Sequence, residues 1–286
     1  LLASTGAGAD TVYGEAGQDT LDYGERLEAG TATMDLNAAN DGNAAATESD
    51  TIRNDVEHFI CPTAAVVCTV TGNALDNRIT AGGGSDTING GAGDDTFIVG
   101  AAAGIGAGAD VFTGGAGIDR VDFTAFGASL DVRMDEAAST TQGKRIGLDV
   151  EDLACPTATA CTVLGNGLNN HLWGSTQVDT LSSAGGDDFV ETRGGADAVN
   201  CGDGSDILIG AGAVPGGDRR HLMEGDGREV VAIVRIGVAV HLGVQARRRR
   251  GHPEVIQRGA TAEHGLPAAG IGGHQPVGVD EQLHAV

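Results

Sequence analysis

Aspartate recurs every nine residues in several stretches of the chain. Twelve nine-residue units, called nonads here, can be aligned at residues 5–22, 72–98, 105–122 and 165–209. The sixth residue is Asp in ten of them: Asp10, Asp19, Asp86, Asp95, Asp110, Asp119, Asp179, Asp188, Asp197 and Asp206. Regularly spaced carboxylates beside glycine-rich backbone offer oxygen ligands, which a hard divalent cation such as Ca²⁺ prefers.

Two further positions of the nonad follow the same period. The fourth residue is Gly in nine nonads, and the eighth is apolar in all twelve, from Val12 to Leu208. Position 8 and its neighbours predict a short strand with one side chain facing inward. The glycine-rich residues before it predict a turn, because glycine adopts backbone angles that other residues resist.

Two strands and two turns take 18 residues, so successive nonads predict one coil in a stack of parallel strands. Like strands would lie about 4.8 Å apart, with the position-8 side chains filling the interior as two rows. We therefore predict an all-β protein, a parallel β-roll or β-solenoid of nonapeptide repeats. The alternative is a Gly- and Asp-rich linker without order, against which the unbroken apolar position 8 counts.

Stacking also predicts columns of carboxylates. Every second nonad lies on the same side of the roll, so position-6 Asp side chains come within about 5 Å of each other and repel. Ca²⁺ between successive turns removes this repulsion, since it accepts about six to eight oxygens from carboxylates and backbone carbonyls. Mg²⁺ fits less well because it requires octahedral geometry and retains its waters.

The nonads resemble the Gly-Gly-x-Gly-x-Asp-x-apolar-x repeat of the RTX (haemolysin-type) calcium-binding proteins. This resemblance implies a parallel β-roll, secretion, and folding triggered by extracellular calcium. Carried onto this chain, the expected metal ligands are Asp10, Asp19, Gly84, Asp86, Gly93, Asp95, Gly108, Asp110, Gly117, Asp119, Asp179, Gly186, Asp188, Gly195, Asp197, Gly204 and Asp206.

Some nonads depart from the repeat. Residues 72–80 and 165–173 have Leu at position 4 and Asn77 or Asn170 at position 6, so we expect weak or absent metal sites there. Gln177 at position 4 weakens the expectation for its own turn.

The nonad blocks differ in how their turns stack. Block 165–209 has five consecutive nonads, which predicts two stacked pairs, Asp179 with Asp197 and Asp188 with Asp206. Block 5–22 has only two nonads, on opposite sides of the roll. Asp10 and Asp19 therefore lack a stacked turn in this chain, and we expect them to bind calcium weakly unless a missing N-terminal part completes their sites.

Two inserts, 23–71 and 123–164, separate the nonad blocks and resemble each other. Val56 to Ala64 aligns with Val150 to Ala158, and each insert is followed by Gly-Asn. The larger unit is about 95 residues long and occurs nearly twice. We expect the inserts to add irregular β coils to the same stack; the alternative is that they loop out as separate small modules.

The cysteines follow this larger unit. Cys61 and Cys68 form one local pair, and Cys155 and Cys161 form another at the same place in the second unit. We predict two local disulfides, which fit an oxidising compartment. A zinc site is the alternative, although neither spacing is typical of one. Cys201 is left over, and we expect it to be free or to pair with another chain.

Composition narrows the class of partner. The chain of 286 residues has 40 acidic and 17 basic residues, a formal net charge of −23, and 48 glycines. This balance argues against nucleic acid as a partner, because phosphate binding requires a basic surface. No apolar run reaches the ~18 residues of a membrane span.

The charge is unevenly distributed and suggests a boundary near Gly210. Residues 1–210 contain 32 acidic and 8 basic residues, whereas residues 211–286 contain 8 and 9. We predict a calcium-binding roll over 1–210 and a compositionally distinct tail over 211–286, disordered or translated out of frame. A C-terminal secretion signal is the alternative for the tail, in which residues 230–240 favour one or two strands.

Sequence motifs of catalysis are missing. There is no His-Glu-x-x-His, no Gly-Lys-Ser/Thr phosphate loop and no Gly-x-Ser-x-Gly. We therefore expect not an enzyme but a secreted, extracellular calcium-binding segment with a structural or adhesive role and a cell-surface or matrix partner. The alternative is the C-terminal repeat region of a larger secreted hydrolase, a protease or lipase, because the chain starts within a repeat and without Met, which we interpret as a missing N-terminal part.

Overall fold

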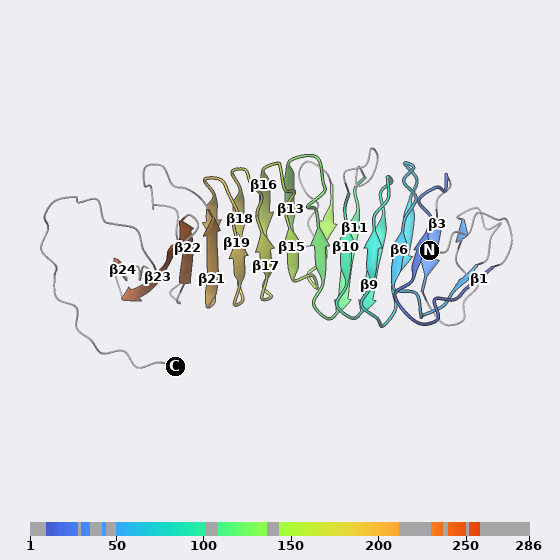
Figure 1. Cartoon of the computed structure of the whole chain (residues 1–286), viewed down its shortest axis with the longest axis horizontal. Coiled ribbons are helices and arrows are strands. Elements are labelled where there is room, and N and C mark those ends of the chain that lie inside the picture. Colours follow the sequence, from blue (N-terminus) through green and yellow to red (C-terminus); the bar gives the residue numbers. More distant parts are fainter. Residues whose placement is uncertain are drawn as a thin grey trace, which may run out of the picture.

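The structure, a computed structural model, describes residues 10–27, 30–34, 42–43, 50–100, 108–135, 143–211, 230–236, 240–249 and 252–257. All regular elements in these ranges are β-strands. Figure 1 shows them stacked side by side along the long axis of the molecule. The strands form two faces that enclose a narrow core.

The first face is one 12-stranded sheet. Nine of its strands belong to the roll and pair in parallel: β2 (Thr20–Asp22), β6 (His58–Ile60), β8 (Arg78–Thr80), β10 (Thr96–Ile98), β12 (Arg120–Asp122), β15 (Asp152–Ala154), β17 (His171–Trp173), β19 (Phe189–Glu191) and β21 (Asp206–Ala211).

The second face consists of three shorter sheets. The first pairs β1 (Thr11–Val12) with β5 (Thr51–Ile52). The next contains, in spatial order, β14 (Arg145–Ile146), β11 (Val111–Ala116), β9 (Thr87–Ala92), β7 (Cys68–Thr71), β3 (Gly30–Thr33) and β4 (Gly42–Asn43). The last contains β13 (Leu130–Arg133), β16 (Cys161–Leu164), β18 (Thr180–Ser182) and β20 (Ala198–Asn200). On this face only β3 and β4 pair in antiparallel fashion among the described strands.

The strand registers confirm the predicted coil. Val190 pairs with Leu208 on the first face and Leu181 with Val199 on the second, each 18 residues apart. The two stacked pairs of turns predicted for block 165–209 are therefore present. Phe97 pairs with Val121, because additional residues between their nonads lengthen that coil to 24 residues. The fold is the all-β, parallel roll that the nonads predict.

The described parts of the inserts belong to the same stack. Strands β6 and β15 continue the first face, and β7, β14 and β16 continue the second. The described residues are thus not separate modules. Each insert also contributes a strand, β3 or β13, that enters the second face where the nonads alone would place none.

One expectation about block 5–22 is wrong. Its turns do have stacked neighbours, since β1 pairs with β5 and β2 pairs with β6. The stacked residues come from the insert that follows, at Asp50 and Glu57. The nonad spacing does not reveal them because the chain first forms β3 and then returns to this coil.

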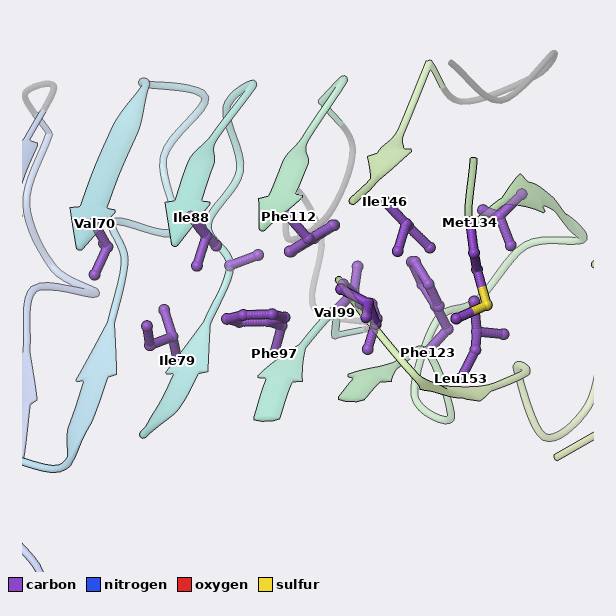
Figure 2. Close-up of a cluster of buried hydrophobic side chains, with 14 of the residues drawn as sticks. Val70, Ile79, Ile88, Phe97, Val99, Phe112, Phe123, Met134, Ile146 and Leu153 are labelled. Atoms are coloured by element: carbon purple, nitrogen blue, oxygen red, sulfur yellow. The ribbon is translucent and has the colours of Figure 1, made fainter. Parts of the chain in front are cut away.

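The core consists of the two predicted rows of apolar side chains. Figure 2 shows Ile88 and Phe112 of the second face opposite Ile79 and Phe97 of the first. All four are completely buried. The rings of Phe97 and Phe112 stack with their centroids 5.7 Å apart. The inserts add residues such as Met134 and Leu153 to the same rows.

Both predicted disulfides are confirmed. Cys61 is bonded to Cys68 and Cys155 to Cys161, and the Cα atoms of each pair are 5.9 Å apart. A zinc site at these four cysteines is therefore excluded. Cys201 is a buried free cysteine.

The described part of the tail extends the first face. Strand β22 (Val230–Ile236) pairs in parallel with β21, and β23 (Val240–Arg249) and β24 (His252–Gln257) follow in antiparallel pairing. The rest of the tail, including its end, lies outside the described residues. The described residues include no helix that is long and apolar enough to cross a membrane.

We predict that Phe97→Ala destabilises the calcium-loaded protein by about 3–5 kcal/mol, because it removes a fully buried ring and leaves a cavity beside Phe112. Urea unfolding at saturating calcium measures the change. Ile118→Ala is the control, since Ile118 is 59% exposed, and it should cost less than about 0.5 kcal/mol. Equal losses would contradict the two-row core.

Candidate calcium-binding columns

The position-6 side chains form two columns, one along each face. The first column follows the 12-stranded sheet and contains Asp19, Glu57, Asn77, Asp95, Asp119, Glu151, Asn170, Asp188 and Asp206. The second column contains Asp10, Asp50, Asp86, Asp110, Lys144, Asp179 and Asp197. The structure thus divides the ten predicted aspartates equally between the faces.

One carboxylate oxygen in each column has the same role throughout. It accepts a hydrogen bond from the backbone N–H of the residue one coil earlier. In the first column Asp95 Oδ1 accepts from Asn77, Asp119 Oδ1 from Asp95, and Asp206 Oδ1 from Asp188, at 2.7, 2.9 and 3.0 Å. In the second column Asp110 Oδ1 accepts from Asp86 at 3.0 Å and Asp197 Oδ1 from Asp179 at 2.9 Å.

The other carboxylate oxygen distinguishes the columns. In the first column Oδ2 is buried without a hydrogen-bond partner in all five aspartates: Asp19, Asp95, Asp119, Asp188 and Asp206. No second-column aspartate among the described residues has such an atom. A buried carboxylate oxygen without a partner costs free energy. A cation beside the first column would remove this cost.

Burial raises the pKa values of aspartates in both columns. Burial, together with the nearby Asp119 and Asp76 carboxylates, raises the pKa of Asp95 to about 7. Burial likewise raises the pKa of Asp119 and of Asp188 to about 6, and that of Asp86 in the second column to about 6. These carboxylates are protonated more easily than exposed aspartates because they are buried beside other negative charges.

The turns of the first column have a distinct backbone conformation. Positions 2 and 4 both have positive φ in five of its nonads: Glu15 and Gly17, Gly91 and Gly93, Gly115 and Gly117, Ala184 and Gly186, and Gly202 and Gly204. Among the described residues of the second-column nonads, only Arg193 and Gly195 share it. The predicted ligands Gly84 and Gly108 therefore lie in turns of a different shape.

Glycine at position 4 is required by the close approach of successive turns. A Cβ atom on Gly117 would clash with the carbonyl oxygen of Gly93, and one on Gly204 with that of Gly186. The position-4 carbonyls of the first column therefore point along the stack toward the next turn. Position 1 is equally close to the carboxylates, since a Cβ on Gly90 or Gly114 would meet Oδ2 of Asp95 or Asp119.

These residues fit a calcium ion. The described residues contain no group of three or more His, Cys, Asp or Glu side chains that could hold a metal, so any site must combine carboxylates with backbone carbonyls. The first column offers both, as unpartnered Oδ2 atoms and position-4 carbonyls, and all are hard oxygen ligands. Asp95 and Asp119 with Gly93 and Gly117 are one such set.

In the two turns with asparagine at position 6, the asparagine side chain finds its hydrogen-bond partners within the protein. Asn77 Oδ1 accepts the N–H of Asn73 at 2.8 Å, and its Nδ2 donates to Asn73 Oδ1 at 3.1 Å and to the Glu57 carbonyl at 3.3 Å. Asn170 makes the same three contacts in the second unit. The amide supplies donors where a carboxylate has none, which is the physical basis for expecting no metal there.

Sequence analysis missed four column residues: Glu57, Glu151, Asp50 and Lys144. Each lies two residues before a buried apolar residue of a strand, as nine of the ten position-6 Asp residues do. Glu57 and Glu151 accept the N–H groups of Asp19 and Asp119, both at 2.9 Å. That offset of two is the signal by which they can be found without the nonad period.

Comparison with known proteins identifies the repeats. A family model described as the RTX calcium-binding nonapeptide repeat (4 copies) matches residues 3–25, 71–104, 106–122 and 164–199. These stretches contain most of the nonads and none of the central part of either insert. No curated protein matches the chain.

We predict that Gly117→Ala lowers stability at saturating calcium by about 1–3 kcal/mol and weakens calcium binding, because Gly117 has a φ of 141° and faces the Gly93 carbonyl. Gly127→Ala is the control, since a Cβ there would meet nothing within 4 Å. Urea midpoints and calcium titrations compare the variants. A neutral Gly117→Ala would show that successive turns do not approach this closely.

Proposed function

We propose that the chain is a secreted calcium-binding β-roll that folds when Ca²⁺ binds, because these four stretches match the RTX calcium-binding nonapeptide repeat family. RTX repeats imply calcium binding. We further propose which residues bind calcium, in which compartment the protein acts, and what role the folded roll has.

The observation that carries the proposal is the row of unpartnered Oδ2 atoms in the first column. Ca²⁺ supplies the positive charge that these oxygens lack and accepts the neighbouring carbonyls as further ligands. Asn77 and Asn170 divide the column into three acidic groups: Asp19 with Glu57; Asp95, Asp119 and Glu151; and Asp188 with Asp206. We propose these three groups as the calcium sites.

Calcium binding of this kind couples to folding. The acidic groups exist only when the coils stack, because their members come from separate turns. The unfolded chain therefore has no comparable site, and calcium stabilises the folded state by mass action. The excess of acidic residues in 1–210 opposes folding when calcium is absent.

We propose an extracellular location. RTX repeat proteins are usually secreted, and the two disulfides are typical of an oxidising compartment. Extracellular modules bind calcium at roughly 0.1–1 mM, so the roll would fold after export.

We propose a structural or adhesive role, with a cell-surface or matrix component as the partner. The buried carboxylates are committed to the stack through Oδ1, so we assign them no catalytic function. A rigid roll with an outward-facing side chain at every second strand residue is suited to presenting a surface.

We predict that the full chain loses most of its β signal in far-UV circular dichroism in EDTA and regains it in ~1–10 mM Ca²⁺. Mg²⁺ at the same concentration should restore much less, because it requires octahedral geometry. Identical spectra in EDTA and calcium would overturn the proposed coupling of folding to calcium.

We predict that Asp188→Asn lowers calcium affinity by roughly tenfold or more, about 1.4 kcal/mol. Asparagine retains the oxygen that accepts the N–H of Asn170 but removes the charge next to Asp206. Asp187→Asn is the matched control, because Asp187 is the exposed neighbour of Asp188 and its substitution removes the same charge outside the column. Calorimetric titration of both variants is the measurement, and equal losses would mean that the position-6 carboxylate has no special role.

A further inference from the structure

Lys144 is a completely buried lysine in the second column. Its side chain has no exposure, and neither has that of its partner Asp110. The Nζ atom donates to Asp110 Oδ2 at 2.7 Å and to the carbonyl oxygen of Gly108 at 2.9 Å. Strand β14 pairs with β11 in the register that places Lys144 one coil after Asp110. A lysine thus occupies a position at which the repeat has Asp.

The two oxygens that Lys144 contacts have a defined place in the nonad. Gly108 is position 4 and Asp110 is position 6 of residues 105–113. These are the two kinds of ligand that we propose for Ca²⁺ in the first column. We propose that the Lys144 ammonium is a built-in cation that takes the place of calcium in this turn, which therefore binds no metal ion. The proposal rests on the proposed function, because it states which turns calcium does not use.

The rest of the second column supports this assignment. Asp86 Oδ2 accepts the N–H of Gly82 at 2.7 Å. Asp179 Oδ2 accepts the N–H of Ser175 at 2.6 Å, and its Oδ1 accepts the Ser175 hydroxyl at 2.7 Å. Each of these carboxylates also accepts the N–H from the preceding coil, at Cys68 or Cys161. The protein itself supplies the donors on this face.

The first unit offers an independent comparison. Asp50 precedes Lys144 by 94 residues, as Val56 precedes Val150, and it has the same place in the column. Its Oδ2 lies 3.7 Å from the Arg26 guanidinium and 3.4 Å from the Tyr23 hydroxyl. The signs of the charges are exchanged between the units, but in both an internal cation meets a buried carboxylate.

Calcium and Lys144 exclude each other from this turn. Both would bind the same carboxylate oxygen and the same carbonyl, and two cations at that separation repel strongly. The ammonium is tethered within the fold, so it does not dissociate when calcium is removed. Calcium therefore cannot bind at this turn in the folded chain, whatever the calcium concentration.

Counting the calcium ions bound per full-length chain by native mass spectrometry tests the proposal. Asp110→Asn should retain the wild-type number, because no ion is bound at Asp110. Asp95→Asn should lose at least one ion, because it removes a first-column ligand. Lys144→Asp should gain one ion, since it restores the carboxylate that the repeat has elsewhere. Arg145→Asp is the matched control; it makes the same charge change at an exposed neighbour and should leave the number unchanged.

Loss of an ion in Asp110→Asn, as in Asp95→Asn, would overturn the proposal, and so would an unchanged number in a folded Lys144→Asp. If Lys144→Asp does not fold, the comparison of Asp110→Asn with Asp95→Asn decides alone. A wild-type chain that binds no calcium would instead overturn the proposed function. In that case the internal cation is tested by Lys144→Met, which should lower the melting temperature by roughly 5–15 °C relative to Arg145→Met; equal melting temperatures would overturn it.

Discussion

Where the later coil has Asp or Glu in the column, stacking depends on one hydrogen bond, from the backbone N–H of a position-6 residue to a carboxylate oxygen of the residue one coil later. This bond sets the register, because a shift of one residue would place the carboxylate in the core and an apolar side chain in the turn. It also creates the electrostatic difficulty of the fold. Two carboxylates about 5 Å apart repel by roughly 3 kcal/mol at an effective dielectric constant of ~20, and each coil adds another.

The protein meets this difficulty in three ways. In the first column, five Oδ2 atoms are buried without a partner, and we propose calcium as the partner. At Asn77 and Asn170 the charge is absent, and the amide donates to the preceding coil. In the second column, backbone N–H groups and the Lys144 ammonium donate to the second carboxylate oxygen. The backbone largely follows the division, because all five unpartnered oxygens accompany a turn with paired positive φ, which the second column shares only at Arg193 and Gly195.

How much the sequence predicts depends on whether the nonad period continues. The apolar position 8, the alternation of faces and the stacked pairs Asp179–Asp197 and Asp188–Asp206 follow from spacing alone, and the structure has them. Glu57 and Glu151 were not predicted, because the inserts interrupt the nine-residue spacing although their strands continue the coils. The place of strands β3 and β13 in the stack could not be predicted, since the chain passes a coil and then returns to it. Lys144 acquires its role from Asp110, 34 residues away, which no local pattern contains.

The turns of Asn77 and Asn170 and the disulfides belong to the same coils. Strand β7 begins at the bonded Cys68 and leads into the turn of Asn77, and β16 begins at Cys161 and leads into the turn of Asn170. Each unit therefore has one coil closed by a covalent bond and by amide hydrogen bonds. Closing so small a loop is worth roughly 2–3 kcal/mol in the chain-entropy account. Asp95 Oδ1 accepts the N–H of Asn77, so the first acidic turn of the next group stacks directly on a turn whose asparagine amide already has hydrogen-bond partners. Calcium would then add an acidic turn to a coil that is already folded, and would not have to order two acidic turns at once.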